Sequence, residues 1–387
     1  MKKSIGILTF TCPCRDPRVA RQIRFLTEYG YHLKVLGAEC NEKLQCSNSG
    51  THFLSSKKDD FIFQRIKKYL FLSMRDFERA FWSRKMVQDL WQHRDALQGI
   101  KVLIANDIET LPLAVALAKY TDAKLILDAH EYAPRQFEDR WRQRVFVLPQ
   151  VRYLCRHYLP HVDAMCTVSP TFAQTYEREF GIRPFLVYNA PPYYDLAPRK
   201  KAPGEIIHLV HHGGAISSRR LERMIRAMQW LDDRFRLHFY LVPTQRRYFR
   251  YLRILARRDP RIHFHNPVPL EKIVPTIHQY DVGVFLLPPT NYNYAHALPN
   301  KFFEFLQARL AVAIGPSKDM QMILQKEKFG IVSPDFTAKS FAATLSKLDH
   351  DQINRMKDRS HAVAHVYAAE HEYQKLRAAV ERLIEYE

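Results

Sequence analysis

The sequence predicts an α/β protein with two open parallel β-sheets. Short apolar runs alternate along most of the chain with longer amphipathic stretches, as strands alternate with helices in a parallel sheet. The alternation occurs in two series of similar length, which a linker beginning at Pro191-Pro192 separates. A chain of 387 residues is long enough for two domains. We therefore expect two Rossmann-like domains that face one another across a cleft.

The first series predicts an N-terminal domain over residues 1–190. Its first apolar run is residues 5–10, and a helical pattern follows over residues 17–29, where Gly30 ends it. Further helices are expected at residues 111–119 and 170–179, whereas residues 47–95 fit the alternation poorly. The remaining apolar runs predict strands at residues 32–36, 102–105, 124–127, 164–168 and 185–188.

The second series predicts a C-terminal domain over residues 191–360. Helices are expected to begin near Leu221, Gln245, Leu270, Pro299 and Met320. Residues 361–387 have apolar residues at helical spacing, which predicts one long helix that packs back on the body of the protein. The strands are expected at residues 207–211, 236–242, 262–265, 282–286, 311–314 and near 330–332.

The composition is that of a folded globular protein, with 47% hydrophobic and 26% charged residues. No run of about eighteen apolar residues occurs, so no segment is expected to span a bilayer. The N-terminus lacks the pattern of a signal peptide, and the six cysteines form no cluster at metal-ligand spacing. We expect a cytoplasmic protein without a metal ion or cofactor.

The charge balance is far from neutral, since 59 Lys and Arg residues stand against 40 Asp and Glu residues, a net charge of +19. An anionic partner is therefore expected. Residues 57–94 and 135–156 interleave basic with large apolar residues, as a helix on an anionic membrane surface does. A solvated basic face explains them equally well. Residues 219–261 hold thirteen arginines, which could steer an anionic ligand. Nucleic acid is not expected, because no base-reading motif occurs.

Three polar motifs follow predicted strands of the first series. Asp16 and Pro17 are typical of a helix start and leave Arg18 facing the cleft, although plain capping explains them too. Asn106-Asp107 and Asp128-Ala-His130-Glu131 each follow an apolar strand, so they are expected to meet at one sheet edge. His130 beside carboxylates could act as an acid, a base or a ligand of a sugar hydroxyl. A structural histidine in a turn is the alternative.

Two motifs of the second series suit a phosphate and a ribose. Gly213 and Gly214 end a strand before Arg219, so backbone amides at a helix start and an arginine could approach an anion. Near Pro299, a cap candidate (Asn300) and a cation (Lys301) converge on a second helix start. Glu304, one turn further, could accept hydrogen bonds from two vicinal hydroxyls. An ordinary amphipathic helix with a solvated lysine is the alternative.

The order of these motifs resembles that of bacterial glycosyltransferases of the GT-B fold, family 4 type, and the similarity covers nearly the whole chain. The resemblance implies transfer of a sugar from a nucleotide-diphosphate donor, with retention of configuration and without a metal. It also implies a role in capsule, lipopolysaccharide O-antigen or exopolysaccharide synthesis. The matching segments are Asp16-Pro-Arg18, Asn106-Asp107, Asp128-Ala-His-Glu131, Val168-Ser169, Asn189-Ala-Pro-Pro192, His212-Gly213-Gly214 and Leu298-Pro-Asn-Lys-Phe-Phe-Glu304.

The resemblance also implies roles for single residues. Glu304 matches the glutamate that binds the donor ribose, and Lys301 and Arg219 resemble the cations that contact the diphosphate. His130 resembles a histidine that contacts the donor sugar. His296 stands where the family has a first glutamate that contacts the transferred sugar.

The expected acceptor, held by the N-terminal domain, is a glycan or a polyprenyl-linked sugar, and the latter would be met at the inner face of the plasma membrane. Two other functions remain open at this point. A UDP-sugar 2-epimerase would use a similar two-domain architecture and would form product from the donor alone. A non-catalytic nucleotide- or carbohydrate-binding protein is suggested by His296 in place of the carboxylate.

Overall fold

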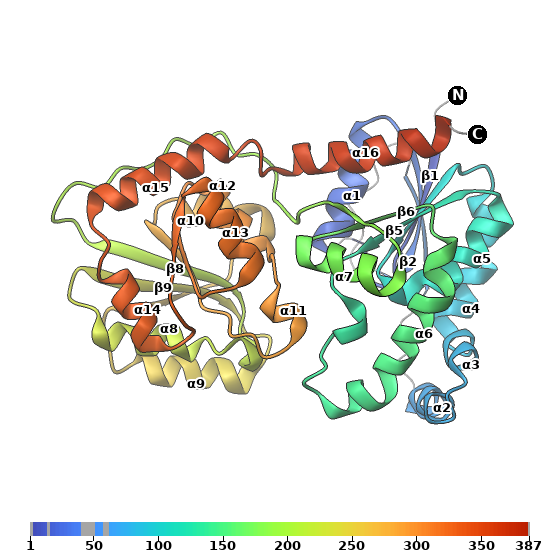
Figure 1. Ribbon diagram of the computed structural model, residues 1–387, viewed down its shortest axis with the longest axis horizontal. Coiled ribbons are helices and arrows are strands. Elements are labelled where there is room, and N and C mark those ends of the chain that lie inside the picture. The colour runs from blue at the N-terminus through green and yellow to red at the C-terminus, as the bar shows by residue number, and fades with distance from the viewer. Residues whose placement is uncertain (1–2, 14–15, 40–50, 57–61, 386–387) are drawn as a thin grey trace. The chain divides into compact units, whose positions relative to one another are not determined.

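The computed structural model describes residues 3–13, 16–39, 51–56 and 62–385 (Figure 1). Its contacts divide the chain into two compact units. The N-terminal unit consists of Met1–Val187, Asn291–Asn293 and Glu372–Glu387, and the C-terminal unit of Tyr188–Thr290 and Tyr294–His371. Each unit contains one parallel sheet, as the sequence predicts.

The sheet of the N-terminal unit has seven parallel strands in the order β3-β2-β1-β4-β5-β6-β7. β1 lies between β2 and β4, with Ile7 opposite both Val35 and Ile104. The strands are apolar because helices cover the sheet and bury both faces, as is usual for parallel sheets. Their bounds are β1 Ser4–Leu8, β2 His32–Ala38, β3 Thr51–Ser56, β4 Val102–Asn106, β5 Lys124–Ala129, β6 Ala164–Thr167 and β7 Phe185–Leu186.

The helices of this unit fill the connections between its strands. Residues 47–95, which fit the predicted alternation poorly, contain the edge strand β3 and three helices in succession. The bounds are α1 Pro17–Glu28, α2 Ile62–Ser73, α3 Phe77–Trp82, α4 Lys85–Gln92, α5 Leu111–Thr121, α6 Leu148–Tyr158 and α7 Pro170–Phe180. Cys155 and Cys166 are buried free thiols, whereas Cys12, in the turn after β1, takes part in a disulfide.

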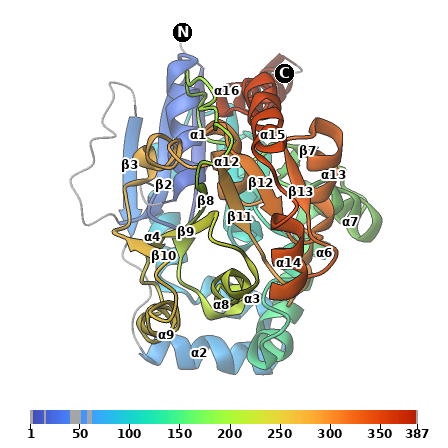
Figure 2. The ribbon, with the colours of Figure 1, turned by 90° about the vertical axis from the view of Figure 1, so that its left-hand side faces the viewer.

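The sheet of the C-terminal unit has six parallel strands in the order β10-β9-β8-β11-β12-β13, with β8 and β11 side by side in its middle (Figure 2). The strands are β8 Ile207–Gly214, β9 Phe235–Val242, β10 Ile262–His265, β11 Val282–Phe285, β12 Ala311–Ile314 and β13 Gly330–Val332. The helices are α8 Glu222–Ala227, α9 Arg246–Ala256, α10 Ile273–Ile277, α12 Asn300–Gln307, α13 Lys318–Glu327, α14 Ala338–Leu345 and α15 His350–Val363. The short α11 (Tyr292–Ala295) is divided between the two units.

The C-terminal stretch is not the single helix that was expected over residues 361–387. α15 ends at Val363, and α16 (Ala369–Glu385) begins after a turn. The side-chain amide of Gln307 donates to the carbonyl oxygens of Ala364 and Tyr367, so these groups are satisfied from outside the helix and the chain can change direction there. From Glu372 onward, α16 belongs to the N-terminal unit.

In the N-terminal unit, α16 packs against α1. Tyr373 stacks on Phe25 with ring centres 4.9 Å apart, and its hydroxyl donates to the carbonyl oxygen of Arg18 at 3.1 Å. Among the described residues, no helix combines the length and the apolar character needed to cross a membrane.

Candidate functional site

In each sheet the strand order reverses near the centre: the first strands are added on one side of the starting strand, and the later strands on its other side. In the C-terminal unit, β9 and β10 extend the sheet on one side of β8, and β11 then returns to the other side. In the N-terminal unit, the same reversal occurs between β1 and β4. Ligands of open α/β sheets bind beyond the carboxyl ends of the strands at such reversals. Both places carry polar residues that the sequence analysis singled out.

Lys301 is the central cation at the reversal in the C-terminal unit. It lies in the first turn of α12, which begins directly after Pro299. Only 6% of Lys301 is exposed. Its Nζ donates a hydrogen bond to the carbonyl oxygen of His212 at 2.8 Å and lies 4.6 Å from the centre of the Phe285 ring. These contacts connect Lys301 to the last residues of β8 and β11, so α12 places the ammonium group near the carboxyl ends of the two strands.

A second cation lies close to Lys301. Gly213 has a φ of +116°, and a Cβ atom there would lie 3.1 Å from Lys301 Nζ and 3.9 Å from Arg219 Nη1. Both cations therefore approach the backbone of one glycine, where a side chain would fill the space. Burial first, and then Arg219, lower the pKa of Lys301 well below its usual value, although Glu304 acts in the opposite direction. An anion bound here would relieve the repulsion between the two cations.

Arg219 lies in a short 3₁₀ turn (Ser217–Arg219) that precedes the helix expected near Leu221. α8 begins only at Glu222, it has six residues, and its first turn contains that carboxylate. An anion site at the amides of this helix start stays a prediction. The half-buried guanidinium group of Arg219 provides the positive charge. Gly214 remains tightly packed, since a Cβ atom there would lie 2.9 Å from the hydroxyl of Thr244.

Glu304 lies one turn after Lys301 on α12 and is 4% exposed. Its Oε2 lies 3.3 Å from Nε2 of His212. Burial, and then the two nearby cations, lower the pKa of His212 well below its usual value, so this imidazole is neutral near pH 7. The site thus contains a buried carboxylate and a buried cation within one turn of α12, and Arg219 lies near that cation. Sequence analysis found Lys301, Glu304 and Arg219 but did not assign His212 to the site.

The structure places His296 beside a second acidic residue. Its Nδ1 lies 3.9 Å from Oδ2 of Asp319, which is 1% exposed in the first turn of α13. Asn300 is the first residue of α12. The sequence does not predict Asp319 as a site residue, because it becomes a neighbour of His296 only through the packing of α13.

The sequence analysis expected Arg18 to face the cleft, but in the structure its side chain is buried within the N-terminal unit. Its Nε donates to Oδ2 of Asp128 at 2.8 Å, and the two residues are 2% and 1% exposed. Burial raises the pKa of Asp128, but Arg18 and His130 outweigh it and the pKa is lowered overall. Arg18 and Asp128 thus form a buried ion pair that joins α1 to β5. Asp16 caps α1, as predicted, by accepting from the amide of Arg18 at 3.1 Å.

His130 lies between the two carboxylates that follow β4 and end β5. Its Nδ1 is 3.6 Å from Oδ2 of Asp107, and its Nε2 is 4.0 Å from Oδ2 of Asp128. The backbone amide of His130 donates to Oδ1 of Asp107 at 3.3 Å. The sequence-predicted residues Asp107, Asp128 and His130 are therefore brought together, with the imidazole between the two carboxylates.

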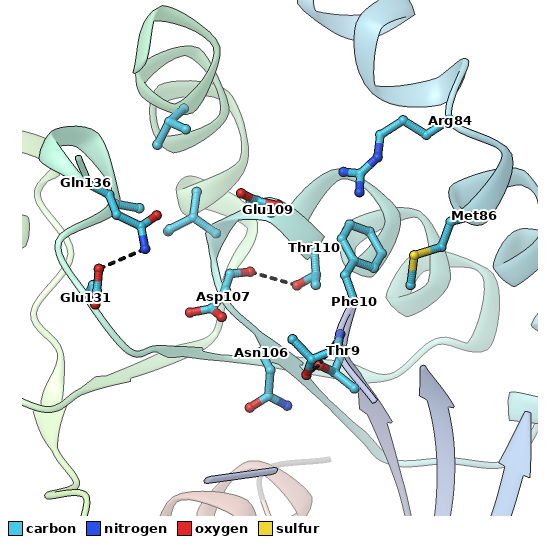
Figure 3. A pocket seen from close by; sticks show the side chains of 14 residues that line it. Thr9, Phe10, Arg84, Met86, Asn106, Asp107, Glu109, Thr110, Glu131 and Gln136 are labelled. Atoms are coloured by element: carbon cyan, nitrogen blue, oxygen red, sulfur yellow. Dashed lines mark hydrogen bonds between the residues drawn. The ribbon is translucent and has the colours of Figure 1, made fainter. Parts of the chain in front are cut away.

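A cavity of about 420 Å³ opens at the reversal between β1 and β4, and we name it the N-unit cavity (Figure 3). Asp107 and Glu131 line it, whereas Arg84, Glu109 and Gln136 had not been assigned to a site. The unassigned residues come from connecting segments without a strand-end pattern. The complete lining is Thr9, Phe10, Thr11, Arg84, Met86, Asn106, Asp107, Ile108, Glu109, Thr110, Glu131, Ala133, Gln136 and Val151.

Solved structures match the chain over nearly its full length. A sucrose-phosphate synthase from Thermosynechococcus elongatus matches with a TM-score of 0.74 and 13% identity, covering 100% of both chains. The fold is GT-B. Anabaena HepE in complex with UDP and glucose has a TM-score of 0.70 at 11% identity and covers 98% of this chain and 100% of its own.

A UDP-forming trehalose-phosphate synthase from Burkholderia xenovorans, in complex with glucose-6-phosphate, gives a TM-score of 0.69 at 10% identity and covers 98% and 100% of the two chains. Neither a protein-family model nor a curated protein sequence matches the chain. The GT-B fold therefore rests on the three-dimensional comparison, and both of its sheets carry polar residues at their reversal points.

Proposed function

We propose that the protein is a glycosyltransferase that binds a nucleotide-diphosphate sugar in its C-terminal unit. The observation that carries the proposal is the pair of cations, Lys301 and Arg219, gathered at the backbone of Gly213. A buried ammonium group beside a guanidinium group is costly without an anion, and a diphosphate supplies one. The structural similarity to HepE, whose structure holds UDP and glucose, supports the same reading.

The arrangement suits the chemistry of glycosyl transfer. Breaking the bond between the sugar and the diphosphate builds negative charge on the leaving phosphate oxygen, which Lys301 and Arg219 are positioned to stabilise. We propose that these cations do so without a metal ion. In transfer with retention, the leaving oxygen takes the proton of the acceptor hydroxyl on the same face of the sugar. His130, which lies between two carboxylates, is proposed to contact the transferred sugar.

Glu304→Gln tests the proposed ribose contact. We expect the dissociation constant of the preferred nucleoside diphosphate to rise about 10- to 100-fold, because hydrogen bonds to a charged group contribute about 1.5–3 kcal/mol. Isothermal titration measures the change after a thermal-shift panel with UDP, GDP, ADP, CMP and dTDP sugars has identified the nucleotide. The affinity for a 2′-deoxyribose analogue of the nucleotide should fall much less in Glu304→Gln than the affinity for the nucleotide itself. Glu271→Gln, on an exposed residue of the same unit, is the control, and an equal loss in both variants would contradict the ribose role.

The two alternatives give different outcomes once a donor is known. Product formed from the donor alone would indicate an epimerase. Nucleotide binding without turnover across a panel of acceptors would indicate a binding protein, which the replacement of a carboxylate by His296 would explain. Transfer that requires an acceptor supports the proposal.

We further propose that the acceptor is a glycan or lipid-linked sugar of a cell-surface polysaccharide and that the N-terminal unit meets an anionic membrane. Exposed apolar side chains of α2 and of residues 141–147 support this. Tyr69 packs edge-on against Phe146 with ring centres 5.8 Å apart, so the two segments form one surface patch. Its most exposed apolar members are Ile66, Leu70, Met74, Trp141 and Val145, and exposed Lys67, Arg140, Arg142 and Arg144 accompany them. Residues 57–61 of the basic stretch lie outside the described residues.

Leu70→Gln tests the membrane proposal. Burying one leucine side chain contributes about 1.5–3 kcal/mol, so we expect binding to vesicles that contain anionic lipid to weaken about 10-fold or more. Co-sedimentation with anionic and with neutral vesicles measures it. Met322→Gln, at an exposed methionine of the C-terminal unit, should bind like the unmodified protein. No sedimentation of the unmodified protein with anionic vesicles would reject membrane binding.

A further inference from the structure

The N-unit cavity contains more negative than positive charge. Three carboxylates line it (Asp107, Glu109 and Glu131), whereas Arg84 is the only Lys or Arg side chain among its lining residues. Arg84 lies over the ring of Phe10 with its guanidinium carbon 4.9 Å from the ring centre. Figure 3 shows the carboxylates and the guanidinium group around the same space. The charge is thus opposite in sign to that of the cluster around Lys301.

The hydrogen-bond donors of the cavity are largely used within the protein. The hydroxyl of Thr110 donates to the carbonyl oxygen of Asp107 at 2.8 Å, and the amide of Gln136 donates to Glu131 at 2.8 Å. The hydroxyls of Thr9 and Thr11 bond to one another at 2.8 Å. A ligand therefore finds few donors here.

Acceptors, in contrast, remain available. Asn106 is 2% exposed, and within the described part of the chain its Oδ1 has no hydrogen-bond partner. Its amide nitrogen is used, since it donates to Gln22 at 3.0 Å. Glu109 is exposed at the rim of the cavity. A ligand that supplies hydrogen-bond donors could reach the exposed Glu109, whereas Oδ1 of Asn106 is buried beneath the cavity.

We propose that the N-unit cavity selects an unphosphorylated sugar as the acceptor, and that a sugar with a protonated amino group binds it best. The inference rests on the proposed function, which makes this unit the acceptor side. Sugar hydroxyls donate to carboxylate and amide oxygens, and an ammonium group adds charge attraction. A sugar phosphate brings a negative charge to three carboxylates and needs donors that the cavity lacks. The chain would thereby differ from the trehalose-phosphate synthase whose structure holds glucose-6-phosphate.

The volume agrees with this proposal. A cavity of about 420 Å³ falls within the range of about 300–1,000 Å³ for small-molecule sites. The charge of Glu109 is the determinant that can be changed with least risk to the fold, because this residue is exposed whereas Asn106 is buried. Glu109 is therefore proposed as a specificity-determining residue.

The test compares glucosamine, glucose and glucose 6-phosphate as ligands of the full chain, by saturation-transfer NMR at slightly acidic pH with the preferred nucleoside diphosphate present. We expect affinity to fall in that order. Glu109→Gln should reduce the preference for glucosamine over glucose 6-phosphate about 3- to 10-fold, as expected for one partly exposed charge interaction. Glu177→Gln, on α7 outside the cavity lining, should leave the order unchanged.

Three results would overturn the inference: tighter binding of glucose 6-phosphate than of glucose, an unchanged preference in Glu109→Gln, or no sugar binding while the nucleotide binds normally. Because sugar binding is measured without turnover, these results are separate from a failure of the proposed function. Sugars bound in the expected order by a chain that binds no nucleotide would contradict the proposed donor site and leave the selectivity of the cavity standing.

Discussion

Lys301→Met should lower the rate of sugar transfer by about one to three orders of magnitude, the range for removal of one preorganised electrostatic contact. The ammonium group is buried beside Arg219, and among the described residues it forms no ion pair with a carboxylate. Glu304 offsets the cost of this burial in part in the free protein, and a bound anion would offset it further. The substitution should therefore affect the ligand-bound protein far more than the free one.

Two measurements separate this effect from unfolding. The rate at which nucleoside diphosphate is formed as a product should fall. The melting temperature of the ligand-free variant should stay close to that of the unmodified protein, because loss of the hydrogen bond to His212 is balanced by removal of a buried charge. Lys326→Met, at a lysine whose side chain is 77% exposed on α13 of the same unit, is the matched control. An unaltered rate in Lys301→Met would remove Lys301 from the proposed mechanism.

Asp128→Ala should destabilise the N-terminal unit by about 3–5 kcal/mol, since it leaves the buried guanidinium group of Arg18 without its partner. Gln22 and Cys166 also donate to this carboxylate, at 3.2 and 3.3 Å, so the substitution removes the acceptor of several groups at once. The corresponding decrease in melting temperature is roughly 6–20 °C for a unit of this size.

The comparison for this variant is Glu28→Ala, which removes the partner of Arg24 in an exposed ion pair on the same helix, α1. Exposed pairs contribute about 0–1 kcal/mol, so this variant should melt within a few degrees of the unmodified protein. Circular dichroism during heating measures both. Equal melting temperatures for the two variants would show that Asp128 does not stabilise the unit through Arg18.

Most strands could be predicted from the sequence because parallel strands buried on both faces are continuously apolar. The predicted bounds of β10 and β12 agree with the structure. β3 was missed because Thr51–Ser56 lies at the edge of the sheet and four of its six residues are Thr, His or Ser, so no apolar run marks it. The break between α15 and α16 was missed because it depends on Gln307, about sixty positions away along the chain.

The candidate site could be predicted where residues directly follow a strand or open a helix, as Asp107 and Lys301 do. Whether a charged side chain is exposed could not be predicted, because it depends on a distant partner. Arg18 is buried because its guanidinium group forms an ion pair with Asp128, 110 positions further along the chain. Arg84 reaches the N-unit cavity from the start of α4, a position that no strand-end pattern marks.

The assignment of Glu372–Glu387 to the N-terminal unit has a consequence for biosynthesis. The first 187 residues emerge from the ribosome long before the segment that carries Tyr373, so Phe25 has no stacking partner until translation is nearly finished. The N-terminal unit therefore lacks its last segment, Glu372–Glu387, until the C-terminal unit has been synthesised. A nascent chain interrupted before α16 therefore leaves the ring of Phe25 on α1 without its contact to Tyr373.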